Sequence, residues 1–182
     1  MFKRLGAFFL DILEVIVGAV AIFLVLYLLV MQPHKVDGNS MQPNYPDAEY
    51  LLTDKISYRF NNPQRGDVVV LKSPIEDKEY IKRVIGLPGE TISLKEGRVY
   101  INDQKLEEKY LASDLLTGGN QALPENGSYK VPEGEYFVMG DNRPNSLDSR
   151  VFGSIAKNKI LGRAWLVYWP VNKAGVVKKP QY

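Results

Sequence analysis

The sequence contains no cysteine and only one histidine, His34, among its 182 residues. The absence of cysteine excludes a disulfide framework, a thiolate nucleophile and a cysteine-ligated zinc site. The single histidine excludes histidine-rich metal sites, and a Ser-His-Asp triad would have to use His34. Lysine is therefore the best available base for an activated serine.

The sequence also lacks an excess of charge of either sign. Its 23 lysines and arginines nearly balance its 21 aspartates and glutamates. A protein that binds nucleic acid usually carries a basic stripe and a clear positive excess, so nucleic acid is not an expected partner. The length allows one compact domain with a buried core and a short appendage.

The appendage is an apolar N-terminal segment. Residues 15–31, 17 in number, carry no charge and would span about 25 Å as a helix; extension back through Ile12 closes the gap to a hydrocarbon core of about 30 Å. A buried soluble helix would show a polar face. A cleaved signal peptide would have a shorter apolar run followed by small residues. We therefore expect residues 1–33 to be a cytoplasmic N-terminus and an uncleaved single-pass anchor.

The orientation of this anchor follows from the basic residues beside it. Lys3 and Arg4 precede the apolar run and favour a cytoplasmic N-terminus. His34 and Lys35, just past its far end, weaken that assignment. On this basis residues 34–182 form a domain on the outer face of the membrane.

After residue 33 the pattern changes to short runs of β-branched and aromatic residues separated by glycine, proline and asparagine. The clearest runs are residues 67–71, 79–85, 91–94, 98–101, 135–139 and 165–169. No long stretch has a helical period. We expect a mainly β fold, with antiparallel sheet closed into a barrel or sandwich-like body. The more polar segment 102–130 is expected to be a surface excursion or a small inserted β subdomain.

The first cluster that could carry chemistry follows the anchor directly and includes Ser40. Gly38 and Pro43 bracket a tight loop in which Ser40 could present its hydroxyl and its backbone N–H to a substrate. Taken alone, this loop is better explained as a polar linker turn, because serine is a common loop residue.

The second cluster is the run Tyr80-Ile81-Lys82-Arg83-Val84-Ile85. Strand alternation places Lys82 and Arg83 on opposite faces, so one of the two cations shares a face with hydrophobic neighbours. Burial would lower the pKa of a lysine and leave a neutral amine that can accept the proton of a serine, which arginine cannot do. A lysine that snorkels from an exposed edge is the alternative.

The densest polar cluster lies in residues 140–150. Its candidate site residues are Asp141, Asn142, Arg143, Ser146, Asp148 and Arg150. Such residues could form an internally satisfied network that orders a loop beside a site. We expect the aspartates and arginines to be structural and Ser146 to be the member that touches the chemistry. Asp67, before the run 68–70, is expected to fix a turn or pair with an arginine.

Together these clusters resemble the bacterial type I signal peptidases, which use a Ser–Lys dyad. The matching segments are residues 40–43, 65–70, 80–89 and 140–153, in the order of that family and behind an N-terminal anchor. The resemblance implies that Ser40 is the nucleophile and Lys82 the general base. It also implies that Ser146 hydrogen-bonds the lysine amine and that Asp148 and Arg150 hold the loop.

Three positions depart from the family pattern. Asn44 stands where threonine is common, and Glu90 stands where aspartate is usual. Gly38 lacks the hydroxyl that Gram-negative members offer to the oxyanion. The backbone N–H of Ser40 is therefore the expected oxyanion donor, with the Gly38 backbone as a second candidate. The single anchor and short middle region resemble the Gram-positive type.

The resemblance implies a membrane-bound serine endopeptidase that removes signal peptides from exported preproteins at the outer face of a bacterial cytoplasmic membrane. Small residues would occupy the first and third positions before the cut, and the substrate would add to a sheet edge as a strand. The implied partners are preproteins, membrane lipid and the nearby export translocon, with no metal or organic cofactor.

Two alternatives remain at this point. A self-cleaving repressor peptidase has the same dyad chemistry but would need a DNA-binding domain in place of the anchor. A catalytically silent membrane-anchored β-module that assists assembly of exported proteins would be expected to have lost Ser40 or Lys82.

Overall fold

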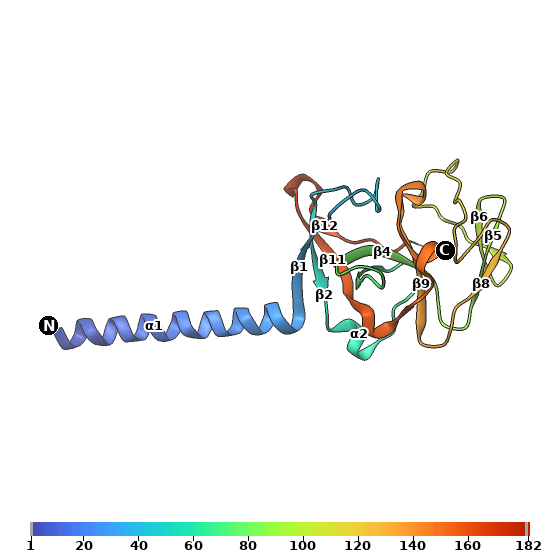
Figure 1. The fold of residues 1–182 in the computed structure, drawn as a ribbon. Coiled ribbons are helices and arrows are strands. Elements are labelled where there is room, and N and C mark those ends of the chain that lie inside the picture. The colour runs from blue at the N-terminus through green and yellow to red at the C-terminus, as the bar shows by residue number, and fades with distance from the viewer. Residues whose placement is uncertain (1, 181) are drawn as a thin grey trace.

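The computed structural model of the chain describes residues 2–180 and 182. A long helix, α1 (Phe2–Val25), extends away from a β-rich body (Figure 1). Its segment Gly6–Val25 is long and apolar enough to cross a membrane, and none of it is buried against the body. A π-helical turn, η1 (Leu26–Val30), joins it to the first strand, β1 (Met31–Lys35). The helical segment thus ends before residue 33, because Met31 already pairs with the second strand.

The body is built mainly on one large antiparallel sheet. Its strands are β1, β2 (Tyr50–Asp54), β3 (Val68–Lys72), β4 (Glu79–Gly86), β9 (Glu135–Met139), β10 (Ile155–Ala156), β11 (Ile160–Trp169) and β12 (Gly175–Val176). Their order is β1-β2-β11-β3-β4-β9-β10, and β12 pairs with β11. The run Val68–Leu71 is buried throughout, as expected for a central strand covered on both faces.

One edge of β4 is only partly used by this sheet. β3 pairs with β4 from Glu79 to Arg83, whereas β9 pairs with it only from Arg83 to Gly86. β1 pairs with β2 alone among the described strands. The first half of β4 and the outer side of β1 are therefore two open strand edges.

A second, four-stranded antiparallel sheet packs at the far end of the body from α1 (Figure 1). It contains β5 (Thr91–Lys95), β6 (Arg98–Ile101), β7 (Gln104–Lys105) and β8 (Ser128–Lys130), in the order β7-β6-β5-β8. The short helices are α2 (Ser57–Phe60), η2 (Arg143–Asn145), α3 (Ser149–Phe152), η3 (Lys157–Lys159) and η4 (Val171–Lys173). This sheet is the predicted small β subdomain, and it begins at Thr91, ahead of residue 102.

Three groups of buried apolar side chains hold these parts together. The first, around Ile92 and Phe137, joins the small sheet to β4 and β9. The second, around Met41 and Leu51, fills the space enclosed by β1, β2, β3 and β11. The third, around Val69 and Val138, lies on the opposite face of β3 and β4. The predicted mainly β, antiparallel architecture is confirmed.

Candidate active site

Ser40 and Lys82 are brought together although 42 positions separate them. Ser40 lies in the loop that follows β1, and Lys82 lies in the middle of β4. The Lys82 Nζ is 2.8 Å from the Ser40 Oγ and 3.0 Å from the backbone oxygen of Ile81. In the order of strands across the sheet, β1 is first and β4 is fifth. The contact between the loop after β1 and the middle of β4 therefore shows that the sheet curls.

The environment of Lys82 favours the neutral amine. The residue is only 3% exposed, and the loss of solvation lowers the pKa of the amine to about 8, although the negative charges of Asp148 and Asp141 act in the opposite direction. No carboxylate of the described residues forms an ion pair with Lys82. The alternative of an exposed, snorkelling lysine is wrong.

The neighbouring cation, Arg83, is buried on the other face and stays charged. Its Nε and Nη2 donate to the two oxygens of Asp141 at 2.8 and 2.6 Å, and its Nη1 donates to the backbone oxygen of Gly66. This paired guanidinium links β4 to the start of the 140–150 loop. Two adjacent buried cations thus have different roles, set by whether a carboxylate faces them.

The 140–150 loop holds the backbone beside the serine. The backbone N–H of Asn142 donates to the Ser40 oxygen at 3.0 Å, and the Asn142 side-chain amide donates to the Asn39 oxygen at 3.0 Å. Gly140 packs against the same point. A β-carbon placed on Gly140 would lie 2.4 Å from the Ser40 backbone oxygen and 2.2 Å from the Ser146 Oγ, so only glycine fits there. No motif in the sequence indicated this role of Gly140.

Asp148 and Arg150 order the loop from within. The Asp148 carboxylate caps α3 by accepting from the Arg150 backbone N–H, and it also accepts from the Gly140 N–H at 3.0 Å. The Arg150 guanidinium donates to Asp148 at 2.9 and 2.8 Å and to the Arg143 backbone oxygen at 2.6 Å. Both side chains are almost fully buried, as expected of the network predicted from sequence.

Arg143 connects the 140–150 loop to the segment that follows β7 in the small sheet. It donates to the Gly140 oxygen at 3.0 Å, to Thr117 at 2.7 Å and to both oxygens of Glu108. Segment 102–130 is therefore more than a surface excursion, because Glu108 and Thr117 satisfy a buried arginine. Because Glu108 and Thr117 lie far from Arg143 along the chain, the sequence alone did not indicate these contacts.

The predicted hydrogen bond between Ser146 and the lysine amine is not formed in this structure. The Ser146 Oγ is buried and has no hydrogen-bond partner among the described residues. Ser149 differs, because its Oγ accepts from the buried backbone N–H of Val138 at 2.9 Å. Within the loop, the Ser149 Oγ therefore has a hydrogen-bond partner, whereas the Ser146 Oγ has none among the described residues.

The two proposed oxyanion donors also differ. The Gly38 N–H donates to the Asp47 carboxylate at 2.8 Å, so the prediction that the Gly38 backbone could stabilise an oxyanion is wrong for this arrangement. Gly38 instead turns the chain, with a φ of +87° that favours glycine. The Ser40 N–H has no acceptor among the described residues and remains available.

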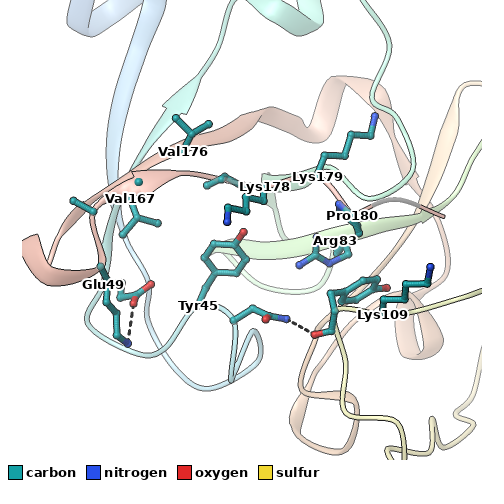
Figure 2. Close-up of a pocket in the computed structure, with 15 residues that line it drawn as sticks. Tyr45, Glu49, Arg83, Lys109, Val167, Val176, Lys178, Lys179 and Pro180 are labelled. Atoms are coloured by element: carbon teal, nitrogen blue, oxygen red, sulfur yellow. Dashed lines mark hydrogen bonds and ion pairs between the residues drawn. The ribbon is translucent and has the colours of Figure 1, made fainter.

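A cavity of about 680 Å³ lies on the Arg83 side of β4. Figure 2 shows Tyr45 and Arg83 beside it, with Lys178 and Lys179 from the C-terminal segment across the opening. Neither Ser40 nor Lys82 lines it. The dyad instead lies where the loop after β1 meets the middle of β4. Within residues 2–180 and 182, no cluster of three or more histidine, aspartate or glutamate side chains is placed to hold a metal ion.

A serine hydroxyl against a buried lysine amine, on a curled antiparallel sheet, is the arrangement of a serine hydrolase. The family model described as signal peptidase, peptidase S26, matches residues 9–169. The chain belongs to this family, and the resemblance drawn from the four motifs is confirmed.

Two named relatives from Bacillus support the same assignment. A signal peptidase I of Bacillus amyloliquefaciens is 40% identical over 161 residues, covering 86% of this chain and 83% of the relative. Signal peptidase I T of Bacillus subtilis is 38% identical over 164 residues, covering 88% and 85%. A crystal structure of a signal peptidase I from Enterococcus faecalis is 35% identical and covers 57% of this chain and 97% of that chain, with a TM-score of 0.48.

Proposed function

We propose that this signal peptidase cleaves the signal peptides of preproteins with Ser40 as its nucleophile and Lys82 as its general base. Family membership supports the reaction. The observation that carries the residue roles is the 2.8 Å contact between the Ser40 Oγ and the Lys82 amine, whose pKa is lowered by burial to about 8. A hydroxyl and a base within hydrogen-bond reach form the pair that nucleophilic catalysis requires.

The reaction then balances with these groups alone. The neutral Lys82 amine takes the Ser40 proton as the Oγ bonds to the scissile carbonyl carbon, and the Ser40 N–H meets the oxyanion. The ammonium gives its proton to the leaving amine as the C–N bond breaks. The same amine then takes a proton from water as its oxygen bonds to the acyl carbon, and the resulting ammonium returns that proton to the Ser40 Oγ as the acyl C–O bond breaks.

The substrate binds, in this proposal, as an extended strand between β1 and β4. Their facing edges are unpaired, and their backbone groups can hydrogen-bond to a third chain. Val36, Met41 and Ile81 pack together beside the dyad, which gives an apolar floor for a small side chain at the cut.

The direct test is cleavage of a preprotein with an Ala-x-Ala site by the full chain in detergent. The wild type should release the signal peptide, and Ser40→Ala should not. Ser113→Ala, an exposed serine away from the dyad, should cleave like the wild type. A Ser40→Ala variant that retains substantial cleavage, or a wild type that does not cleave, would contradict the proposal; the latter outcome would favour a silent assembly module.

Ser146 is proposed to complete the amine's hydrogen bonding. A neutral amine has one lone pair and two hydrogens. When Ser40 donates to the lone pair and Ile81 accepts one hydrogen, one hydrogen remains. The Ser146 Oγ is buried and has no hydrogen-bond partner among the described residues, so it is the loop hydroxyl that we propose accepts this hydrogen.

Substituting the two serines should therefore give opposite results. Ser146→Ala should lower kcat by roughly ten- to a thousandfold without lowering thermal stability, because no hydrogen bond is lost from the resting structure. Ser149→Ala should lose about 1–3 kcal/mol of stability, because the Val138 N–H is left unsatisfied, with a much smaller effect on kcat. Equal effects on kcat, or a Ser146→Ala loss that only follows unfolding, would leave Ser146 a packing residue.

We further propose that α1 spans the cytoplasmic membrane once, with the β body outside and in contact with lipid. Lys3 and Arg4 of the sequence support this orientation. Exposed large side chains gather where β2, β11, η4 and β12 meet: Tyr50, Tyr168, Trp169, Val171 and Val176. The turn after β11 lies on the side of the body from which α1 extends (Figure 1). Proximity to the translocon follows if preproteins are cut as they emerge.

Tryptophan fluorescence can test the lipid contact. The chain has two tryptophans, so Trp165→Phe leaves Trp169 alone and Trp169→Phe leaves Trp165 alone. In bilayers that contain bromine-labelled lipid, Trp169 should be quenched strongly and the less exposed Trp165 weakly. Equal or absent quenching of the two would contradict a lipid contact at this turn.

A further inference from the structure

The cavity on the Arg83 side of β4 is not used by the proposed mechanism, and its lining is strongly positive. Its volume of about 680 Å³ is within the range of about 300–1,000 Å³ that is usual for ligand pockets. Five cations and one carboxylate line it: Arg83, Lys109, Lys173, Lys178 and Lys179, with Glu49. A cleft lined by charges of one sign concentrates ligands of the opposite sign. The lining therefore fits an anion.

Three of the five cations already have a carboxylate partner. The pairs are Arg83 with Asp141 at 2.6 Å, Lys173 with Glu49 at 3.2 Å and Lys179 with Asp67 at 3.7 Å. Lys109 and Lys178 are exposed and form no ion pair within residues 2–180 and 182. Two positive charges at the cavity are thus left for a ligand to neutralise.

These two lysines come from different parts of the chain. Lys178 follows β12 in the C-terminal segment, and Lys109 lies between β7 and β8. Figure 2 shows Lys178 directed toward the hydroxyl end of Tyr45, whereas Lys179 points away from Tyr45. The Tyr45 ring is buried, and burial raises the pKa of its hydroxyl, which therefore stays a neutral hydrogen-bond donor. An ammonium and a hydroxyl donor thus line the same part of the cavity.

The cavity adjoins the exposed apolar side chains that are proposed to contact lipid. Val176 belongs to that group, is 61% exposed and also lines the cavity. It lies two residues before Lys178 and pairs with Leu166 of β11. The turn after β11 lies on the side of the body from which α1 extends (Figure 1). When α1 spans a membrane, lipid headgroups are therefore the nearest source of an anion for this cavity.

We propose that this cavity binds a phosphate group through Lys178 and Tyr45, and that in the membrane this phosphate belongs to the headgroup of an anionic phospholipid. The inference rests on the proposed orientation of α1 and the β body. A phosphate diester carries one negative charge, and its oxygens accept hydrogen bonds from an ammonium and from a hydroxyl. Lys109, elsewhere on the lining, adds to the positive potential.

Two consequences follow from a bound headgroup. A zwitterionic headgroup would bring a positive charge toward the same lysines, so it should bind more weakly than an anionic one. The headgroup would also hold the body at a second point besides α1, which limits how far the body can turn relative to the bilayer.

The test titrates the full chain in dodecyl maltoside micelles with short-chain lipids and measures their affinity by calorimetry. Dihexanoyl phosphatidylglycerol should bind at least about tenfold more tightly than dihexanoyl phosphatidylcholine. Lys178→Gln should weaken phosphatidylglycerol binding about fivefold, and Lys178→Glu about twenty-fivefold. Tyr45→Phe, which removes only the hydroxyl, should weaken it about two- to tenfold.

Lys130→Gln is the matched control for the loss of one positive charge. Lys130 is an exposed lysine of β8 in the small sheet, and it does not line the cavity. Its substitution should leave the affinity unchanged. Equal weakening by Lys130→Gln and Lys178→Gln, or equal binding of the two lipids by the wild type, would overturn the inference, because either result shows attraction without a site.

Inorganic phosphate distinguishes the two sources of the anion. In large excess it should not displace phosphatidylglycerol, because the acyl chains of the lipid also contact the exposed apolar side chains beside the cavity. Displacement that depends on Lys178 would assign the cavity to a soluble anion and overturn the headgroup.

Cleavage of the Ala-x-Ala preprotein separates this inference from the proposed function. The Lys178 variants should cleave it in detergent like the wild type, because neither Ser40 nor Lys82 lines the cavity, and retained cleavage also shows that they are folded. No cleavage by the wild type would overturn the proposed function and leave the lipid affinities to decide the site. Absent quenching of Trp169 with Lys178-dependent binding in micelles would reject the proposed lipid contact and uphold the phosphate site.

Discussion

Lys82→Arg is expected to lose at least about a thousandfold in kcat, although it keeps a positive charge on a side chain of similar length. A guanidinium stays protonated at any accessible pH, so it cannot take the proton of Ser40. Lys82→Met, which fills a similar volume with no charge, should be equally inactive. Both variants should be measured for peptide cleavage and thermal unfolding, because only a base assignment predicts inactivity in a folded protein.

Two comparisons make this prediction sharper. Lys130→Arg, at an exposed position in β8, should leave cleavage unchanged. Ser40→Ala combined with Lys82→Met should be no worse than either single change, because the two residues act as one unit. Appreciable turnover by Lys82→Arg, or additive losses in the double variant, would contradict the general-base role.

The pH dependence of the wild type should report the same amine. The amine must be neutral in the free enzyme, and burial lowers its pKa to about 8. Below that value kcat/KM should therefore fall about tenfold for each pH unit, and above it the profile should level off. A profile that is flat from about pH 6 to 8, or that falls as the pH rises towards 8, would show that Lys82 does not act as the base.

The sequence predicted those parts of the protein that depend on local pattern. The six runs of β-branched and aromatic residues are all strands, with β11 starting earlier, at Ile160. β1 and β2 were missed: the apolar segment before β1 masks its start, and Pro33 interrupts its pattern. The Ser40 and Lys82 motifs were recognisable because nucleophile and base must be particular residue types.

The rest depends on contacts that no local pattern records. Asp141 pairs with Arg83 across 58 positions, and Arg143 with Glu108 across 35, so the partners of the polar cluster could not be named in advance. The Gly38 N–H looked available until the fold placed Asp47 against it. His34 meets Glu79 only because the sheet curls. Register and curvature, which are properties of the whole sheet, decide each of these contacts.

Gly140→Ala is expected to lower catalysis strongly, although Gly140 contributes no side chain to the dyad. A β-carbon at this position would lie 2.4 Å from the Ser40 backbone oxygen and 2.2 Å from the Ser146 Oγ, so the chain around Ser40 must move. A shift of about 1 Å in a catalytic group can cost about a hundredfold in rate, so we expect kcat to fall by roughly a hundred- to a thousandfold. Overpacking should also lower stability by about 1–3 kcal/mol.

A matched control and a double variant separate the two effects. Gly118→Ala adds a methyl group where nothing lies within 4 Å, and it should behave like the wild type. Gly140→Ala with Ser146→Gly removes the clash with the serine side chain but keeps the clash with the Ser40 oxygen. Because Ser146→Gly itself removes the hydroxyl proposed to hydrogen-bond the amine, the reference for kcat is the Ser146→Gly single variant. We expect the double variant to recover part of the thermal stability lost in Gly140→Ala and to have a kcat well below that of Ser146→Gly alone. A double variant as active as Ser146→Gly alone would show that the Ser40 backbone does not depend on Gly140.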